Sequence, residues 1–328
     1  MSADNTVLID GQRRIGAVKR LMGLSEFSVF IALVAMFTIM CFASPYFLRM
    51  NNIMNVLIQI SRYGIITAGM ALIMISGGID LSVGYAVGFC ACVFAWFSLH
   101  TALPWFVVGF ITLGVGAGIG FFNGLLVTRV GLVPFIVTLA SMKILGGGML
   151  LITGGMPITF KSELSWLGYG RIGPVPIPVI IMFLMIFLFS IFAKYTEAGR
   201  GLYAVGNNER AAILSGVNSK NLKCLSYVIT STLCAIVGII VAGNLGTADQ
   251  SMGIGYEMDV IAAVVIGGVA MSGGEGHVWG ALIGASIMGI LRNAFILLGI
   301  SSYWQSIVIG AVILAAMTVD IIRGKKRE

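Results

Sequence analysis

The chain has 328 residues, of which 58% are hydrophobic and only 10% charged. A soluble domain carries about 25% charged residues, so this composition excludes a water-soluble protein and requires a surface that faces lipid. The net charge of +7 does not indicate nucleic-acid binding, because most basic residues gather in segments that flank apolar runs. These segments hold Arg13, Arg14, Lys19 and Arg20, then Lys194, Arg200, Arg210, Lys220 and Lys223, and finally Arg323, Lys325, Lys326 and Arg327.

Ten apolar runs follow along the chain and predict an all-α, polytopic integral membrane protein with about ten transmembrane helices. An even number of spans returns the C-terminus to the side of the N-terminus, and the basic ends place both termini in the cytoplasm. We therefore expect a tail at 1–26, a transmembrane domain at 27–322 and a tail at 323–328. The runs are residues 27–48, 63–76, 83–99, 104–127, 130–152, 177–193, 224–246, 258–271, 279–300 and 303–322.

Two of these runs are short, because residues 63–76 and 258–271 span only 14 positions each. Each ends in Ser-Gly-Gly, and the nonamers 76–84 and 272–280 share four identities. Paired short, glycine-interrupted segments are typical of discontinuous helices beside a substrate path. Two ordinary glycine-rich connections would show the same pattern.

Small and sulfur-containing residues in the runs favour packing roles. Gly116, Gly120 and Gly124 form a stripe at helical spacing, which predicts a face that packs closely against another helix. The five cysteines lie in or beside apolar runs with no histidine near them, so we expect buried thiols and no metal site.

Charged side chains inside the apolar runs predict buried ion pairs. Lys143 and Arg292 lie well within their runs, where a charge normally finds a partner. The candidate partners are Asp80, Asp259 and Glu275, although Asp80 is also placed to cap the helix that follows it. Polar residues at similar depth either bind substrate or bridge helices. Candidate residues of the translocation pathway are Asp80, Ser82, Asn123, Phe135, Thr138, Asn293 and Gln305.

The longest polar segment between apolar runs is 194–223, and the span count places it in the cytoplasm. Within it, Asn208 and Glu209 suit the first turn of a short helix, and Gly216 suits its left-handed exit. Two turns are marginal alone in water, so a helix that presents Ala211, Ala212 and Leu214 predicts a docking partner or a membrane surface.

The chain resembles the permease subunits of ABC sugar importers of the ribose, xylose, arabinose and galactoside type. The resemblance covers roughly residues 45–320. The motif at 77–84, Gly-Gly-Ile-Asp-Leu-Ser-Val-Gly, carries it most clearly. Further matches are Asn123-Gly124, Pro134-Phe135-Ile136, Thr138-Leu139, Gly199-Arg200, 204–207, Ala211-Ala212, Ser215-Gly216-Val217, Tyr256-Glu257, Asp259, 261–268, Gly273-Gly274, Tyr303-Trp304-Gln305 and Asp320.

The resemblance implies a non-catalytic subunit in the prokaryotic inner membrane, without cofactor or metal. Its implied partners are cytoplasmic ABC ATPase chains, an external binding protein, a second permease subunit as homodimer or heterodimer, and a monosaccharide. It also implies that the loop 194–223 contacts the ATPase. The implied coupling residues are Gly199, Arg200, Gly206, Asn207, Asn208, Glu209, Ala211, Ala212, Ser215 and Gly216.

The chain departs from the family pattern at two places: the family often has serine or threonine where this chain has Val269-Ala270, and it carries arginine where this chain has Gly146. Lys143 lies three residues earlier on the same helical face, and we expect it to supply the missing charge. The sequence contains no Gly-x-x-x-x-Gly-Lys-Ser/Thr motif, so active transport requires a separate ATPase. Three alternatives remain. The first is a permease of this architecture that carries a branched-chain amino acid, a nucleoside or an autoinducer. The second is a secondary transporter that uses the three carboxylates, and the third is an intramembrane enzyme, for which the sequence lacks a His/Asp/Ser or metal constellation.

Overall fold

The computed structural model describes residues 25–325. The basic residues near the N-terminus, and the last three residues of the chain, lie outside this range. Within the described part the chain is mostly helical, with almost no sheet. The helices are α2 (Ser25–Ala43), α3 (Met50–Ile75), α4 (Val83–His100), α5 (Trp105–Leu125) with the π-helical turn η1 (Leu126–Val130), α6 (Pro134–Thr153), η2 (Glu163–Ser165), α7 (Trp166–Tyr169), α8 (Ile177–Tyr195), α9 (Glu197–Asn207), α10 (Glu209–Leu214), α11 (Ser219–Leu245), α12 (Tyr256–Ile266), α13 (Val278–Leu297) and α14 (Ser302–Lys325).

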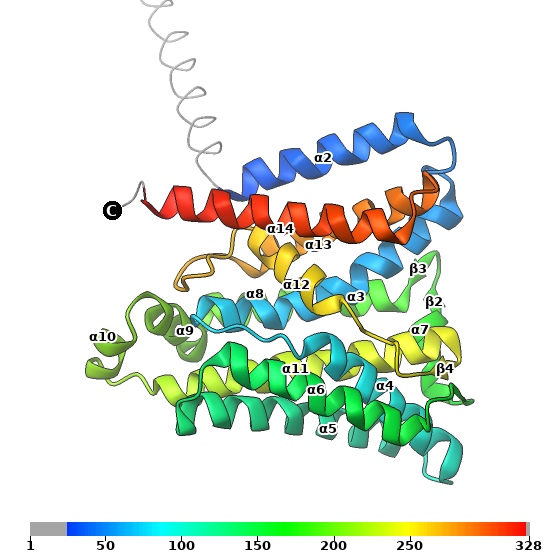
Figure 1. Cartoon of the computed structure of the whole chain (residues 1–328), viewed down its shortest axis with the longest axis horizontal. Helices are drawn as coiled ribbons and strands as arrows, with labels where there is room; N and C mark the ends of the chain where they lie inside the picture. The colour runs from blue at the N-terminus through cyan, green and yellow to red at the C-terminus, as the bar shows by residue number, and fades with distance from the viewer. Residues whose placement is uncertain (1–24, 326–328) are drawn as a thin grey trace, which may run out of the picture.

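The strands are two residues each and tie loops together at one end of the bundle. β1 (Ile158–Thr159) pairs antiparallel with β4 (Thr247–Ala248), and β2 (Arg171–Ile172) pairs antiparallel with β3 (Val175–Pro176). In Figure 1, α9 and α10 lie at the left end of the helices and the labelled strands at the right end. The loops around residues 153–176 and 194–223 thus lie at opposite ends, as the predicted topology requires.

Seven helices in the described range are long and apolar enough to cross a membrane. They are α3, α4, α5 with η1, α6, α8, α11 and α13. The apolar parts of α2 and α14, Phe27–Ala43 and Tyr303–Val312, are shorter. Every predicted apolar run therefore contains a helix and the all-α polytopic prediction is confirmed, while the count of ten spans stays a prediction.

The two short runs have different outcomes. The run at 63–76 is the second half of α3, which begins at Met50 and is 26 residues long. The polar residues before it are helical too, and the Arg62 guanidinium donates to the Asn244 Oδ1 at 2.9 Å. The run at 258–271 is short in fact, because α12 has 11 residues and is about 17 Å long, against the ~30 Å of a bilayer core.

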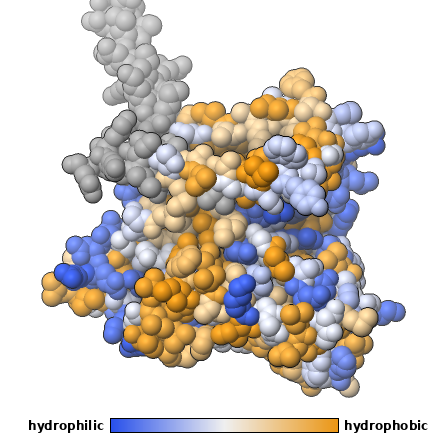
Figure 2. Space-filling model, viewed as in Figure 1, coloured by the Kyte–Doolittle hydropathy of each residue, from blue (hydrophilic) through white to orange (hydrophobic). Residues whose placement is uncertain are grey.

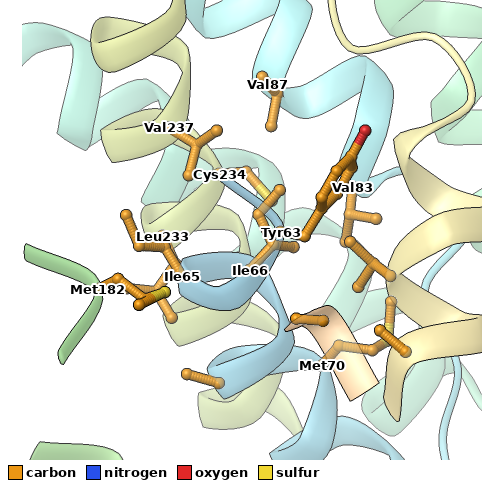
Figure 3. Packing of buried hydrophobic residues seen from close by; sticks show 14 of the residues in the cluster. Tyr63, Ile65, Ile66, Met70, Val83, Val87, Met182, Leu233, Cys234 and Val237 are labelled. Carbon is orange, nitrogen blue, oxygen red and sulfur yellow. The ribbon is translucent and has the colours of Figure 1, made fainter. Parts of the chain in front are cut away.

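Helix α11 lies at the centre of the bundle and packs on α3, α4 and α5. The predicted glycine stripe of α5 faces it. A Cβ on Gly120 would lie 2.3 Å from the Tyr227 carbonyl oxygen, and one on Gly116 would lie 2.6 Å from that of Ser231. Figure 3 shows the adjoining apolar core, where Ile65 of α3 lies beside Leu233 of α11. All five cysteines are free; Cys90, Cys92 and Cys234 are buried as expected, whereas Cys41 and Cys224 are only half-buried.

The outer faces of the bundle are apolar. Large hydrophobic side chains are exposed on α2, α5, α6 and α8, for example Phe42, Phe110, Leu151 and Phe187. Figure 2 shows hydrophobic residues over both the upper and the lower edge of the molecule, and hydrophilic residues gathered at the left over α9 and α10. This distribution fits a belt of lipid contact that ends where the polar loop begins.

Candidate functional site

Helix α10 projects from the end of the bundle with a cap at each end. The Asn208 side chain accepts from the Ala211 amide at 3.0 Å, as the sequence predicts. At the other end Gly216 has φ +85°, and the Val217 amide donates to the Ala212 carbonyl at 3.0 Å. Both predicted caps are thus confirmed, and the second is a Schellman arrangement that only a left-handed residue allows.

An ion pair ties α10 to the first turns of α11. The Lys223 ammonium lies 2.7 Å from the Glu209 carboxylate. Partial burial raises the pKa of Glu209, but the hydrogen bond and the charge of Lys223 lower it by more, so the net pKa lies below its ordinary value. Glu209 is therefore ionised at neutral pH and holds α10 against the bundle.

The exposed face of α10 differs from the predicted one. Leu214 is 90% exposed and Ile213 is 53% exposed, and Ala211 is also exposed. Ala212 is only 5% exposed, so the expectation that it faces outward is wrong. Its position in the six-residue helix turns it toward the chain's own core. The surface that α10 offers is an apolar tip formed by Ile213 and Leu214.

Helix α9 anchors this tip to the bundle. Its first turn is capped by Thr196, whose hydroxyl accepts from the Gly199 amide at 2.9 Å. A Cβ on Gly199 would lie 2.1 Å from the Phe192 carbonyl oxygen, so this glycine permits close packing on α8. Arg200 is exposed and donates to the Tyr195 carbonyl at 3.0 Å. Ser215 donates to the Ala211 carbonyl at 3.0 Å and stays within its own turn.

Two glycine-rich breaks lie against each other and against α9: the first break is residues 76–82, between α3 and α4, and the second break is residues 272–276, between α12 and α13. The Gly274 amide donates to the Ile75 carbonyl at 2.8 Å, which joins the second break to the end of α3. A Cβ on Gly273 would lie 3.0 Å from the Gly77 backbone, and one on Gly206 would lie 1.9 Å from the Ile75 carbonyl oxygen. The two breaks, which are similar in sequence, are therefore also in contact in space, and three backbone segments meet where only glycines fit.

The first break leads into a buried polar cluster, which we define as Asp80, Ser82, Asn123 and Ser141. One oxygen of Asp80, Oδ1, accepts from the Ser82 amide at 2.8 Å and from the Ser82 hydroxyl at 2.6 Å. The Asn123 amide donates to the Ser82 hydroxyl at 3.0 Å, and the Ser141 hydroxyl donates to the Asn123 oxygen. The cluster thus links the break to α5 and α6.

Because this polar cluster is buried, any of its polar atoms that lacks a hydrogen-bond partner lowers the stability of the fold. Asp80, Ser82 and Asn123 are all 0% exposed, and the second carboxylate oxygen of Asp80, Oδ2, has no hydrogen-bond partner among the described residues. Asp80 also forms no ion pair with a described lysine or arginine. A buried acceptor without a donor carries a penalty of about 1–3 kcal/mol, more for a charged group. The site therefore keeps one unused acceptor for a hydroxyl or water donor.

The other predicted pathway residues lie apart from this cluster. Thr138 is buried but donates to the Pro134 carbonyl of its own helix at 2.9 Å. Asn293 exchanges amide hydrogen bonds with Asn52 of α3 at 2.8 and 3.2 Å, which makes it a bridge between helices. Phe135 is 52% exposed, and Gln305 donates to the Ile300 carbonyl at 3.4 Å at the start of α14.

The predicted buried ion pair is found for Arg292. Its guanidinium lies 2.5 Å from the Asp259 carboxylate, whose side chain is 1% exposed. The guanidinium carbon also lies 5.8 Å from the centre of the Tyr63 ring. This pair therefore joins α12, α13 and α3. Glu275 lies in the second break, where its carbonyl accepts from the Ala270 amide at 3.2 Å.

The prediction that Lys143 is a buried charge is wrong. Lys143 lies halfway along α6, but its side chain is exposed on the outer face of the helix. It forms no ion pair with a residue of the described range. Helical spacing turns Ser141, two residues earlier, inward to the polar cluster and Lys143 outward.

Some site residues carry no signal in the sequence. Ser141 is one serine in an apolar helix, and Tyr203 is one tyrosine in the polar loop, yet the Tyr203 hydroxyl donates to the Gly276 carbonyl at 2.8 Å. Both act through partners at least 18 residues away, and no local pattern reports such a contact. Asp80, Ser82 and Asn123, by contrast, lie in sequence motifs that single them out.

These membrane-length helices and apolar outer faces define a multi-pass membrane protein. A family model described as "Branched-chain amino acid transport system / permease component" matches residues 52–317, and the chain belongs to this permease family. It is thus a transmembrane permease subunit, and the resemblance to permeases of ABC sugar importers is confirmed.

The curated relatives cover nearly the whole chain. The chain is 39% identical over 302 residues to the ribose import permease protein RbsC of Escherichia coli K12, which covers 90% of this chain and 94% of the relative. The RbsC of Haemophilus influenzae is 38% identical over 309 residues, 93% of this chain and 95% of that one. The galactose/methyl galactoside import permease protein MglC of E. coli K12 is 33% identical over 325 residues, 93% and 96% of the two chains. No solved structure matches the chain.

Proposed function

We propose that this chain is the non-catalytic translocation subunit of an ATP-driven ABC importer, and that it carries a monosaccharide delivered by an external binding protein. The observation that carries this proposal is the capped α10, whose apolar tip projects from the end of the bundle. A six-residue helix is not stable alone in water, and an exposed leucine at its end favours insertion into a partner's groove. Import permeases for ribose and galactose among the relatives support a sugar cargo.

The partner that fits this tip is the ATPase. The chain has no nucleotide-binding loop of its own, so the energy of ATP must enter through a contact with another chain. The segment 194–223 is basic, which favours the cytoplasmic side, where ATP is available. We propose that α10 docks there and that both termini lie on the same side.

The polar cluster is the best-supported wall of the translocation pathway. Asp80 keeps one oxygen without a donor, and the hydroxyls of a sugar are donors. Because Asp80, Ser82 and Asn123 are fully buried, a sugar reaches them only when the break at 76–82 moves. Alternating access would then open and close this break during the transport cycle.

A substitution at the exposed tip tests the docking step. We expect Leu214→Asp to leave the subunit inserted in the membrane, because this side chain is 90% exposed, but to abolish co-purification with its co-expressed ATPase chain. Uptake of radiolabelled ribose or galactose into proteoliposomes should fall to background. Met156→Asp is the matched control, since Met156 is 73% exposed and lies two residues before β1, which pairs with β4 at the end opposite α10 (Figure 1), and should leave ATPase binding intact.

Two results would contradict the proposal. If Leu214→Asp binds its ATPase and imports as the wild type does, α10 is not the docking element. That result would favour a secondary transporter that uses Asp80. If the unmodified complex imports leucine and not a monosaccharide, the architecture stands but the cargo is the amino acid that the family description names.

A second permease subunit completes the proposed importer. Lys143 lies at the midpoint of an apolar helix and is exposed on the chain's own surface. A lysine at the centre of a bilayer costs about 2.5–3.5 kcal/mol on insertion scales, so it normally faces protein or water. We therefore propose that the outer face of α6, with Ala140, Lys143 and Gly147, faces a second copy of the chain across the pathway.

A further inference from the structure

Helices α9 and α10 form one continuous unit. Asn208 ends α9 and begins α10: its amide donates to the Ala204 carbonyl at 3.0 Å, while its carbonyl accepts from the Ala212 amide at 3.0 Å. One residue therefore belongs to both helices, and no flexible spacer separates them. A displacement of the α10 tip must be passed to α9.

Two side chains of α9, the half-buried Tyr203 and the exposed Asn207, fasten this helix to the second break. The Tyr203 hydroxyl donates to the Gly276 carbonyl at 2.8 Å, and the Asn207 amide donates to the Gly274 carbonyl at 3.2 Å. Both acceptors are backbone carbonyls of a segment without helix or strand, at glycines with φ +121° and +79°. A side chain on Gly274 would collide with Asn207, because a Cβ there would lie 2.5 Å from it.

The same helix also touches the first break. Gly206 lies between Tyr203 and Asn207 in the sequence and packs on the Ile75 carbonyl, where α3 ends. That carbonyl accepts from the Gly274 amide, so the two breaks and α9 share one contact. Asp80 follows five residues after Ile75, and its carboxylate is the start of the buried polar cluster.

We infer that Tyr203 and Asn207 are positioning residues that couple the docking helix to both glycine breaks. Motion of α10 pulls the 272–276 segment through their two hydrogen bonds, and the 76–82 segment follows through the shared Ile75–Gly274 contact. Asn207 therefore acts inside the chain, whereas the family resemblance assigns it with the ATPase contact. The inference deepens the proposed function and rests on it.

The test separates docking from coupling in the reconstituted importer with its ATPase and binding protein. Tyr203→Phe removes one hydroxyl, and Asn207→Ala removes one amide. We expect both variants to bind the ATPase and to hydrolyse ATP at the basal rate. Stimulation of ATP hydrolysis by ribose- or galactose-loaded binding protein, and sugar uptake, should fall about tenfold for each variant, because a partly buried hydrogen bond between α9 and the second break is lost.

Matched controls distinguish coupling from general damage. Tyr195→Phe changes a tyrosine on α8 that is 65% exposed, and it should keep both stimulation and uptake. Gly206→Ala introduces a methyl group 1.9 Å from a carbonyl and should uncouple the importer, whereas Gly118→Ala on α5 meets nothing within 4 Å and should not.

The failure of this inference differs from the failure of the proposed function. If the unmodified chain does not bind an ATPase, the proposed function fails. If Tyr203→Phe and Asn207→Ala both bind the ATPase and show wild-type stimulation and uptake, the coupling role is wrong while the importer stands. If both variants lose ATPase binding together with stimulation, they support the structure of the docking surface and overturn a separate coupling role.

Discussion

At the scale of single residues, the ion pair between Arg292 and Asp259 joins α13 to α12 beside the Tyr63 ring of α3. Arg292 and Asp259 were both visible as charges inside apolar runs, where each needs a partner, and the structure pairs them. Ser141 was not visible, because a serine in an apolar helix is tolerated without a partner. Lys143 shows the limit of the charge argument, since depth in a run does not tell which way the side chain faces.

The Arg292–Asp259 pair gives a prediction at this scale. Arg292→Met should lower the free energy of unfolding by about 3 kcal/mol, because it leaves a carboxylate that is 1% exposed without its cation. The double variant Arg292→Met with Asp259→Leu should lie within about 1 kcal/mol of wild type, since apolar groups of similar size replace the pair.

Unfolding in mixed micelles, followed by circular dichroism, gives the free energies for a double-mutant cycle. Arg129→Met serves as the control, because Arg129 is at the end of η1, where its guanidinium donates to the exposed Asn221. It should change stability by less than about 1 kcal/mol. A double variant as unstable as the sum of its two single changes would show that the pair is not coupled.

At the scale of elements, caps and glycine patterns were reliable because they are local. Asn208 and Gly216 fix the ends of α10 through bonds within one turn, and the sequence shows both. The face of the helix was less predictable. A six-residue helix has no clear periodicity, so burial of Ala212 depends on how α9 and α11 hold α10. The start of α3 was missed for a different reason, because polar residues that pack inside the bundle look like a loop.

The link between α10 and α11 gives the prediction at this scale. Because the pKa of Glu209 is lowered in the folded chain, its contribution is fully present above its ordinary pKa of about 4.3 and is lost as pH falls through the lowered value. The protection factors of the amides at residues 211–214, which remove the pH dependence of intrinsic exchange, should therefore fall on acidification below pH ~4. The effect should be small, roughly 0.2–1 kcal/mol, since the pair is partly exposed.

Glu209→Gln should show faster exchange at neutral pH and no further step on acidification, measured by hydrogen–deuterium exchange with mass spectrometry. Glu197→Gln on α9 changes an exposed carboxylate that pairs with no described lysine or arginine, and should keep the wild-type profile. An unchanged acid step in Glu209→Gln would assign the pH dependence to another group.

At the scale of the whole molecule, composition and run lengths determine the class of the fold, but not its connections. The apolar runs all become helices, yet 11 residues of α12 do not reach across a bilayer, and the two breaks meet through backbone contacts between glycines. Such contacts depend on the packing of α3, α9 and α13, which lie far apart in the sequence. The sequence shows that the nonamers 76–84 and 272–280 are similar, but only the structure shows that these two segments touch.

The arrangement of two subunits gives the prediction at this largest scale. If the Lys143 face of α6 meets a second copy, a cysteine at Ala140 should lie near its symmetry mate, because Ala140 is exposed one turn from Lys143. In a chain whose five cysteines are replaced, Ala140→Cys should form a cross-linked dimer in native membranes when treated with a short bifunctional thiol reagent. Phe42→Cys on α2, which is 86% exposed, should stay monomeric as the control.

Because a lysine at the centre of a bilayer costs free energy, contact between two copies through the Lys143 face of α6 should depend on the charge at this position. Lys143→Met should keep the dimer, because it removes a charge without removing the face, while Lys143→Glu in both copies should weaken cross-linking at Ala140→Cys if the two lysines face a common acceptor. Cross-linking at Phe42→Cys with none at Ala140→Cys would place the second subunit against α2 instead. Lys143 would then face lipid at a cost of about 2.5–3.5 kcal/mol, and Lys143→Met should raise the yield of inserted protein.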